Sequence, residues 1–293
     1  AFSFQLNQRF DSLIIQSQRL HFDFIQCHQN DFRFCMGLLP AYIDKIEELT
    51  IFEQDTPSQV YAFLYFFQSF TLFKRLRKLY FHFNDQAIDW NIIEDALYSL
   101  LQTKIETLSI KTNIKENRFS IGTTIVCLFG LKSLKKFSLL SNFNYMNWCD
   151  LANMSSNIEH LTLSGIYCEF KDLQYIFQCA PRLKYLDIEI VVGRTPFYGE
   201  KAKRLKKIIV VMSTLHTFVL YFTENSLVTM DMLTEHLNFM PALKYFEIKA
   251  RNELLDANGW KLLLETSLPS LTHFILRTTS SRVKEIGLDN VLS

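Results

Sequence analysis

The side chains best suited to metal binding or catalysis are scattered along this sequence and form no recognised motif. Histidine and cysteine come together only in HFDFIQCH, residues 21–28, where His21 and His28 share a segment with Cys27. The spacings of the six cysteines fit neither a zinc site nor a disulfide framework. We therefore interpret this segment as surface histidine and core cysteine, with a metal site as the alternative.

Other enzyme signatures are missing from the sequence as well. The eight glycines are dispersed and form no GxGxxG or GxxxxGK[ST] phosphate loop, and neither GxSxG nor HExxH occurs. Cys149, which precedes Asp150, and Cys179 have no base nearby in the sequence that would activate a thiol. We therefore expect no enzyme, no catalytic residue, no cofactor and no metal. An enzyme with an unrecognised site is the alternative.

Composition limits the classes of partner and the compartment. The 31 basic and 30 acidic residues nearly cancel, so the charge gives no argument for nucleic acid or an anionic membrane. The cysteines contain no CxxC pair, and we expect them to be reduced and mostly buried, as in an intracellular protein of the cytoplasm or nucleus. The apolar runs 60–73 and 208–222 are too short or too interrupted to span a bilayer, and we interpret them as core segments of a soluble protein.

The sequence contains an internal repeat. A hexamer of the form L-x-x-L-x-L, with Ile or Phe allowed at the apolar positions, occurs nine times at nearly even spacing. The copies begin at residues 46, 76, 105, 134, 158, 183, 215, 243 and 271. Because large and polar residues alternate, each hexamer should form a short strand with one buried face. The side chains expected beneath the strands are Leu79, Leu108, Phe137, Leu161, Leu186, Phe218, Phe246 and Phe274.

Stretches with helical spacing separate the hexamers. WNIIEDALYSLLQT (90–103) places its apolar residues on one stripe, which predicts an amphipathic helix. KDLQYIFQCAP (171–181) and MDMLTEHLNFMP (230–241) look alike, and each ends at a proline that stops a helix. RLHFDF (19–24) alternates like an irregular first strand. One strand and one helix cannot bury their own apolar faces, so the units must stack into an α/β solenoid with a parallel sheet.

The repeat resembles the leucine-rich repeat over residues 17–293. The family pattern places Asn, Cys or Thr three residues after the last apolar position. Five units match it, through Asn84, Asn113, Asn142, Thr223 and Thr279. The other four units depart from it, and we expect less regular turns at Gln54, Ile166, Val191 and Arg251. The resemblance implies a horseshoe with the parallel sheet on its concave face and helices on its convex face.

The first residues, AFSFQLNQRFDSLI (1–14), lie outside the repeat and resemble the last helix of an F-box. The match rests on Phe4, Leu6, Phe10 and Leu13 as apolar positions and on the Asn7–Arg9–Phe10 signature. We assign residues 1–16 to this F-box remnant and 17–293 to the leucine-rich-repeat domain, with an ordinary capping helix as the alternative for 1–16. The first two F-box helices are missing, which suggests a fragment of a longer protein or a degenerate copy.

These two resemblances imply a protein-interaction module. An F-box beside leucine-rich repeats implies substrate recognition for an F-box-type (cullin-RING) ubiquitin ligase, whose adaptor would bind only if the F-box is complete in the parent protein. The alternative is a stand-alone leucine-rich-repeat scaffold or inhibitor without a ubiquitin role.

The inner wall of the solenoid is the expected binding surface for a protein partner. The third and fifth hexamer positions and the residue after the hexamer should face it, because side chains alternate along a strand. The candidate partner-binding residues there are Tyr80, His82, Tyr185, Asp187, Glu189, Tyr221, Tyr245 and Glu247. Tyrosines are enriched at binding hot spots, and the three carboxylates form an acidic cluster that would select a partner with exposed Lys or Arg. The alternative is that tyrosine simply suits strands.

One basic segment, Arg194 to Lys207, falls in the longest unit of the repeat. We interpret it as a loop leading into a solvated helix face. A nuclear localisation signal or a phosphate-binding patch is the alternative.

Overall fold

The computed structural model describes residues 16–25, 27–53, 58–84, 90–113, 119–141, 146–166, 168–190, 210–222, 229–251 and 257–279. The chain divides into two compact units, Ala1–Phe143 and Asn144–Ser293, which are treated separately below. Several predicted features lie outside the described residues: positions 1–15 of the F-box remnant, the turn residues Gln54, Asn142, Val191 and Thr223, and the basic segment Arg194 to Lys207.

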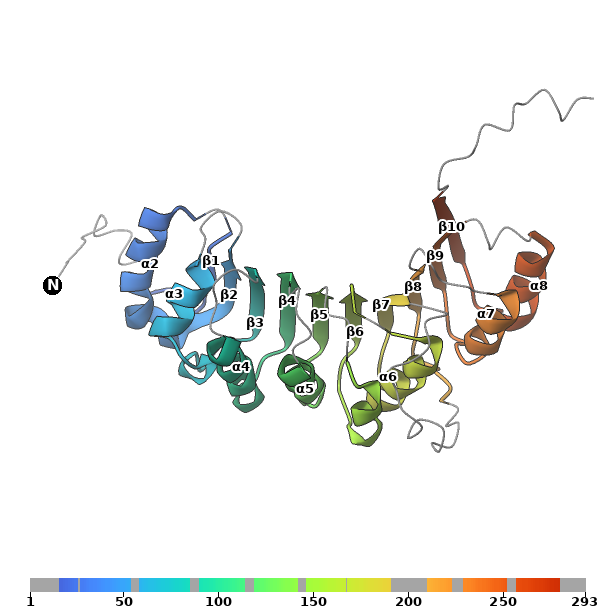
Figure 1. Cartoon of the computed structure of the whole chain (residues 1–293), viewed down its shortest axis with the longest axis horizontal. Coiled ribbons are helices and arrows are strands. Elements are labelled where there is room, and N and C mark those ends of the chain that lie inside the picture. The colour runs from blue at the N-terminus through green and yellow to red at the C-terminus, as the bar shows by residue number, and fades with distance from the viewer. Residues whose placement is uncertain are drawn as a thin grey trace, which may run out of the picture. The chain divides into compact units, whose positions relative to one another are not determined.

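The first unit contains five parallel strands in chain order (Figure 1). They are β1 (Leu20–Asp23), β2 (Ile46–Phe52), β3 (Lys78–Asn84), β4 (Thr107–Asn113) and β5 (Lys136–Ser141). Helices occupy the connections: α2 (Gln29–Tyr42), α3 (Gln59–Phe66), α4 (Trp90–Ser99) and α5 (Phe119–Phe129). Short 3-10 turns η1 (Ile43–Lys45), η2 (Phe70–Leu72) and η3 (Leu100–Gln102) complete the described part of this unit.

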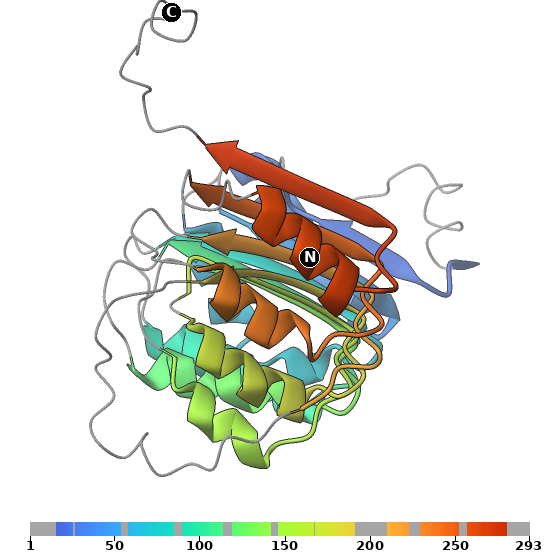
Figure 2. The same cartoon turned by 90° about the vertical axis from the view of Figure 1, so that its right-hand side faces the viewer.

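The second unit repeats this plan with another five parallel strands in chain order (Figure 1). Figure 2 shows its helices, coloured yellow-green to red, on one side of these strands. They are β6 (His160–Ser164), β7 (Tyr185–Ile190), β8 (Thr217–Phe222), β9 (Tyr245–Arg251) and β10 (His273–Thr279). Its helices are α6 (Leu173–Cys179), α7 (Met230–Leu237) and α8 (Ala257–Ser267), with 3-10 turns η4 (Trp148–Asn153) and η5 (Phe170–Asp172).

The predicted α/β class and parallel strands are confirmed. Every hexamer contains one strand, which begins at its third residue in all copies except Ile46–Phe52, where it begins at the first. The irregular first strand expected over 19–24 is β1, and a break in its pairing with β2 lies between Leu20 and His21. The helices expected before Pro181 and Pro241 are also present, as α6 and α7.

A shared backbone carbonyl fixes the register between neighbouring hexamers. The carbonyl oxygen of Arg77, the second residue of its hexamer, accepts the N–H groups of Glu106 at 2.7 Å and Thr107 at 3.0 Å. The same pair of bonds recurs at Glu106 in the first unit and at Glu159, Lys184, His216 and Lys244 in the second. Equivalent hexamer positions therefore lie side by side on adjacent strands within each unit.

The fourth hexamer residues form the core beneath the strands. Leu79, Leu108, Phe137, Leu161, Leu186, Phe218 and Phe246 are all buried, as expected. Phe274 is only half-buried, so its predicted burial is wrong. It lies in β10, which has only β9 as a neighbour among the described strands. Its ring centroid is 5.8 Å from that of Phe246 and 4.9 Å from that of Trp260.

The carboxyl group of Asp172, directly before α6, is almost completely buried. The Asp172 side chain is 1% exposed and accepts the backbone N–H of Glu169 at 2.9 Å, as part of a capping box. Burial raises the pKa of Asp172 to about 7, because the charged carboxylate is poorly solvated there. A salt bridge of 2.6 Å between Lys171 and Glu169 lies beside it.

We expect Leu161→Ala to destabilise the protein by about 2–5 kcal/mol, because it removes a fully buried side chain and leaves a cavity. Thr162→Ala, one residue along the same strand and only half-buried, is the matched control and should cost far less. The measurement is the shift in the urea unfolding curve. Equal effects of the two substitutions would contradict the assignment of the buried face.

Asp172 predicts a particular dependence of stability on pH. Its folded pKa of about 7 lies above its ordinary value of 3.8, so its contribution is fully present at low pH and is lost as pH rises from about 4 to about 7. The Asn side chain cannot ionise. The free energy of unfolding of Asp172→Asn should therefore exceed that of the parent by an amount that grows as pH rises through this window. Urea unfolding at several pH values measures the difference, with the exposed Asp231→Asn as control. A difference independent of pH would show that Asp172 ionises normally.

Candidate interaction surface

The candidate residues of the second unit lie in three columns across β7, β8 and β9. The pairing places Tyr185, Thr217 and Tyr245 in the first column, Asp187, Val219 and Glu247 in the second, and Glu189, Tyr221 and Lys249 in the third. Because side chains alternate along a strand, these columns lie on the sheet face opposite the core residues, which we call the open face. The register thus brings together all six candidates predicted in this unit.

Glu247 is the centre of a hydrogen-bonded group on this face. It is 7% exposed, and its carboxylate accepts the Tyr245 hydroxyl at 2.7 Å and Arg277 Nε at 2.9 Å. Lys249 Nζ lies 3.6 Å from the same carboxylate. The Tyr245 hydrogen bond, together with Arg277 and Lys249, holds the pKa of Glu247 below its usual value against the opposing effect of burial. The carboxylate is therefore charged and balanced by two cations.

Lys249 connects this group to the next strand. Its ammonium donates to the Tyr221 hydroxyl at 2.6 Å and lies 4.0 Å from the centre of the Tyr221 ring. A cation held over a ring face by both contacts has little freedom. Tyr221 and Lys249 thus form a fixed pair beside Glu247.

Tyr185 and Asp187 form a second, weaker pair on β7. The Tyr185 hydroxyl donates to Asp187 Oδ2 at 3.4 Å. Burial, reinforced by the negative charge of Asp187, raises the pKa of Tyr185 to about 12. Burial also raises the pKa of Asp187, although the Tyr185 hydrogen bond opposes that shift. The Tyr185 hydroxyl is therefore protonated at neutral pH and can donate a hydrogen bond.

Glu189 has a structural partner as well. Its Oε2 accepts the backbone N–H of Gly165 at 2.8 Å, in the turn after β6. Gly165 has φ of 70°, a left-handed conformation that suits glycine. The three carboxylates predicted to form an acidic cluster are therefore distributed among separate contacts. Lys249 and Arg277, which the candidate set omitted, offset much of their charge.

The candidates of the first unit, Tyr80 and His82, line a different feature. A pocket of about 360 Å³ opens on β1–β4, with Glu48, Thr50, Tyr80, His82, Ser109 and Lys111 in its wall. Glu48 is held by Lys78 at 2.9 Å and by His21 at 3.4 Å, so its charge is partly balanced.

His82 is more buried than an inner-wall residue was expected to be. Its ring packs edge-on against Phe52 with 4.2 Å between ring centroids, and its Nδ1 is buried without a hydrogen-bond partner. Burial, and secondarily the charge of Lys111, lowers the pKa of His82. The imidazole is therefore neutral at neutral pH, and its unpaired Nδ1 lies buried behind the pocket wall.

The chemistry-bearing residues considered from sequence are not assembled into a metal site. No group of three His, Cys, Asp or Glu side chains suited to a metal ion occurs among the described residues. All six cysteines are free thiols. Cys168 and Cys179 are buried as expected, whereas Cys27, Cys35, Cys127 and Cys149 are only half-buried. No helix in the described part of the chain combines the length and apolar character needed to cross a membrane.

Glu247→Gln tests the hydrogen-bonded group. The bond to the Glu247 carboxylate raises the pKa of Tyr245, so removing the charge should let Tyr245 ionise at lower pH. Titration of ¹³Cζ-labelled tyrosine by NMR measures this pKa. Asp231→Asn, an exposed change at the start of α7, should leave it in place. An unchanged Tyr245 pKa in Glu247→Gln would mean that the bond does not form in solution.

The interpretation of this surface rests on its own side chains. No protein-family model matches the chain, and no curated protein matches it either.

Proposed function

We propose that this chain is a protein-interaction module whose partner binds on the open face of the sheet. The observation that carries the proposal is the array across β7–β10, in which tyrosine, acidic and basic side chains are aligned by strand register and held by mutual hydrogen bonds. Side chains ordered before binding lose little entropy when a partner arrives. Tyrosine and arginine are also the residues that most often carry binding energy at interfaces.

The charges of this array favour a partner of mixed character. Glu247 is already balanced by Arg277 and Lys249, so a purely basic surface would gain little there. Asp187 accepts a long hydrogen bond from Tyr185 and forms no ion pair among the described residues, although the more distant charge of Lys249 acts on it. A partner that places a Lys or Arg at Asp187 and apolar groups over Tyr185 and Tyr245 matches both features.

We further propose that the units form a leucine-rich-repeat solenoid of the horseshoe type, with the open face as its concave side. One strand in each hexamer and the recurring shared carbonyl support this assignment. A solenoid of this kind offers a long surface for another protein to lie on. The free thiols support a reducing compartment, the cytoplasm or the nucleus.

The specific role that we propose is substrate recognition for an F-box-type ubiquitin ligase. Its support is the F-box-like pattern in residues 1–14 directly before the repeat. The module would hold the substrate, and a ligase core bound through a complete F-box would transfer ubiquitin. A stand-alone scaffold or inhibitor is the second candidate. Binding of the ligase adaptor to the chain when it is extended by a full F-box separates the two.

Once affinity purification and mass spectrometry have supplied a partner, Tyr185→Ala and Tyr245→Ala should each weaken its binding by about 1–3 kcal/mol, the usual range for anchor residues. Titration calorimetry measures the loss. The matched control is Tyr98→Ala, because Tyr98 is a 56% exposed tyrosine on α4 rather than on the open face. A loss with Tyr98→Ala while both open-face changes are silent would place the partner on the helices.

A further inference from the structure

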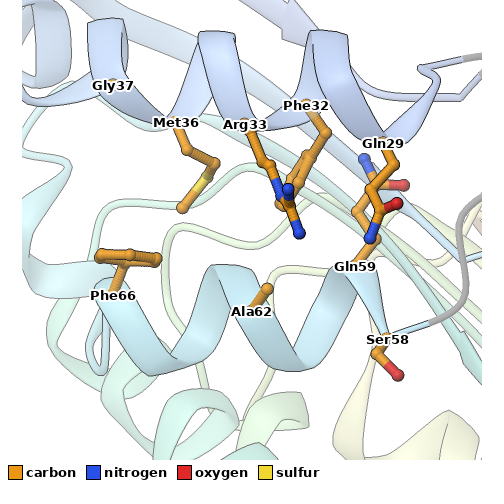
Figure 3. Close-up of a pocket in the computed structure, with 9 residues that line it drawn as sticks. All are labelled: Gln29, Phe32, Arg33, Met36, Gly37, Ser58, Gln59, Ala62 and Phe66. Atoms are coloured by element: carbon orange, nitrogen blue, oxygen red, sulfur yellow. The ribbon is translucent and has the colours of Figure 1, made fainter.

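A second pocket lies between helices α2 and α3 of the first unit (Figure 3). Its volume is about 540 Å³, within the roughly 300–1,000 Å³ typical of small-molecule sites. Only residues of these two helices and Ser58, which precedes α3, line it among the described residues. None of the open-face candidates contributes to it.

The two ends of this pocket differ in chemistry. Met36 and Phe66 lie at one end, and Gln29, Ser58 and Gln59 lie at the other, with Arg33 projecting from α2 between them (Figure 3). The pocket is thus apolar at one end and polar at the other.

The polar end contains a buried hydrogen-bond donor without a partner. Gln59 is 2% exposed, and its side-chain Nε2 is buried without a hydrogen-bond partner. An amide donor left unpaired in this way is costly unless something else fills the pocket. Ser58, the residue before α3, makes no side-chain hydrogen bond that caps the positive end of this helix.

The only charge among the described lining residues is positive. Arg33 is the sole ionisable side chain among them, and it forms no ion pair within the described part of the chain. A guanidinium and an unpaired amide donor that line the same pocket can together bind the two oxygens of a carboxylate. A cationic ligand has no counter-charge in this set.

The apolar end is open rather than filled. Phe66 is 69% exposed, so its ring is accessible at the rim of the pocket. At Gly37 an added Cβ would meet no atom within 4 Å, so there is free space beside α2 at this end. A hydrocarbon chain lying there would cover Met36 and the Phe66 ring.

We propose that the α2/α3 pocket binds a small amphiphilic carboxylate of the fatty-acid type. Its carboxylate lies between Arg33 and the Gln59 amide at the start of α3, and its hydrocarbon tail runs along Ala62 and Met36 to Phe66. This site is independent of the open face and of the protein-interaction role proposed for it.

Isothermal titration calorimetry with three probes tests the assignment. Decanoate, kept below its micellar concentration, should bind at one site per chain. Acetate, which has the head group without the tail, and decyltrimethylammonium, which has the tail with the opposite charge, should each bind at least about tenfold more weakly. If decanoate gives no binding, or if decyltrimethylammonium binds equally well, the proposal is wrong.

Two substitutions locate the ligand. Arg33→Gln should weaken decanoate binding by about tenfold or more, because it removes a charge-assisted hydrogen bond. Gly37→Leu should block the tail end, since its side chain grows into open space rather than into a packed neighbour. Arg182→Gln removes the same charge from an exposed site in the second unit and should leave the affinity unchanged.

Circular dichroism and urea unfolding should show all three variants to be folded. Arg33 and Gly37 are exposed on α2, so neither change disturbs the core. If Gly37→Leu nevertheless unfolds, Arg33→Gln decides the question alone. Parental affinity in Arg33→Gln would overturn the head-group assignment, and equal losses in Arg33→Gln and Arg182→Gln would show only a general effect of charge.

Discussion

The carbonyl of the second hexamer residue, which accepts two N–H groups from the next hexamer, is the contact on which both units depend. It recurs in both units where chain segments enter their strands, for example at Arg77 and at His216. Because both hydrogen bonds converge on one oxygen, a shift by one residue would lose both and would turn every side chain to the other face. This contact therefore decides which residues are core and which are surface.

The same register aligns the side chains of the open face. Tyr185, Thr217, Tyr245 and His273 are aligned because each is the third residue of its hexamer. The same alignment brings Glu247 beside residues of β9 and β10 that neutralise it. The positions of these side chains are therefore fixed by the shared-carbonyl hydrogen bonds. Those bonds lie in the backbone and not on the open face itself.

The strands were predictable because their pattern is local and repeated. Leucine or phenylalanine at the fourth position lies beneath a strand in every hexamer, and only Phe274, in the last described strand, is incompletely covered. The helices were less predictable. α4 and α7 have a clear apolar stripe, whereas α3 is apolar on nearly all sides and α2 contains Pro40. Those two segments were not assigned as helices, since neither shows the helical period plainly.

The details of the candidate site were predictable only in part. Strand register could be inferred from the hexamers, and it correctly places Tyr185, Tyr221 and Tyr245 on one face. The pairing of Glu247 with Arg277 depends on side-chain rotamers and on the neighbouring strand, which a single sequence does not specify. The same holds for His82, whose ring is covered by Phe52 from the adjacent strand. The hexamer pattern in the sequence does not specify the side-chain contacts between neighbouring hexamers.

The contrast between strands and helices also explains where a pocket can form. In the sheet, the shared carbonyls hold each strand close to its neighbour, which leaves little freedom for gaps between strands. Among the described residues, no backbone hydrogen bond of this kind joins one helix to another, so the helices depend on side chains for their spacing. In α2, Gly37 offers no side chain to fill the space, and Pro40 cannot donate to the carbonyl one turn earlier, at Met36. Both residues lie toward the end of α2 where the α2/α3 pocket is apolar and open. The strand layer of this fold thus provides an ordered surface, which carries the pocket beside Tyr80 and His82, and the helical layer provides the α2/α3 pocket.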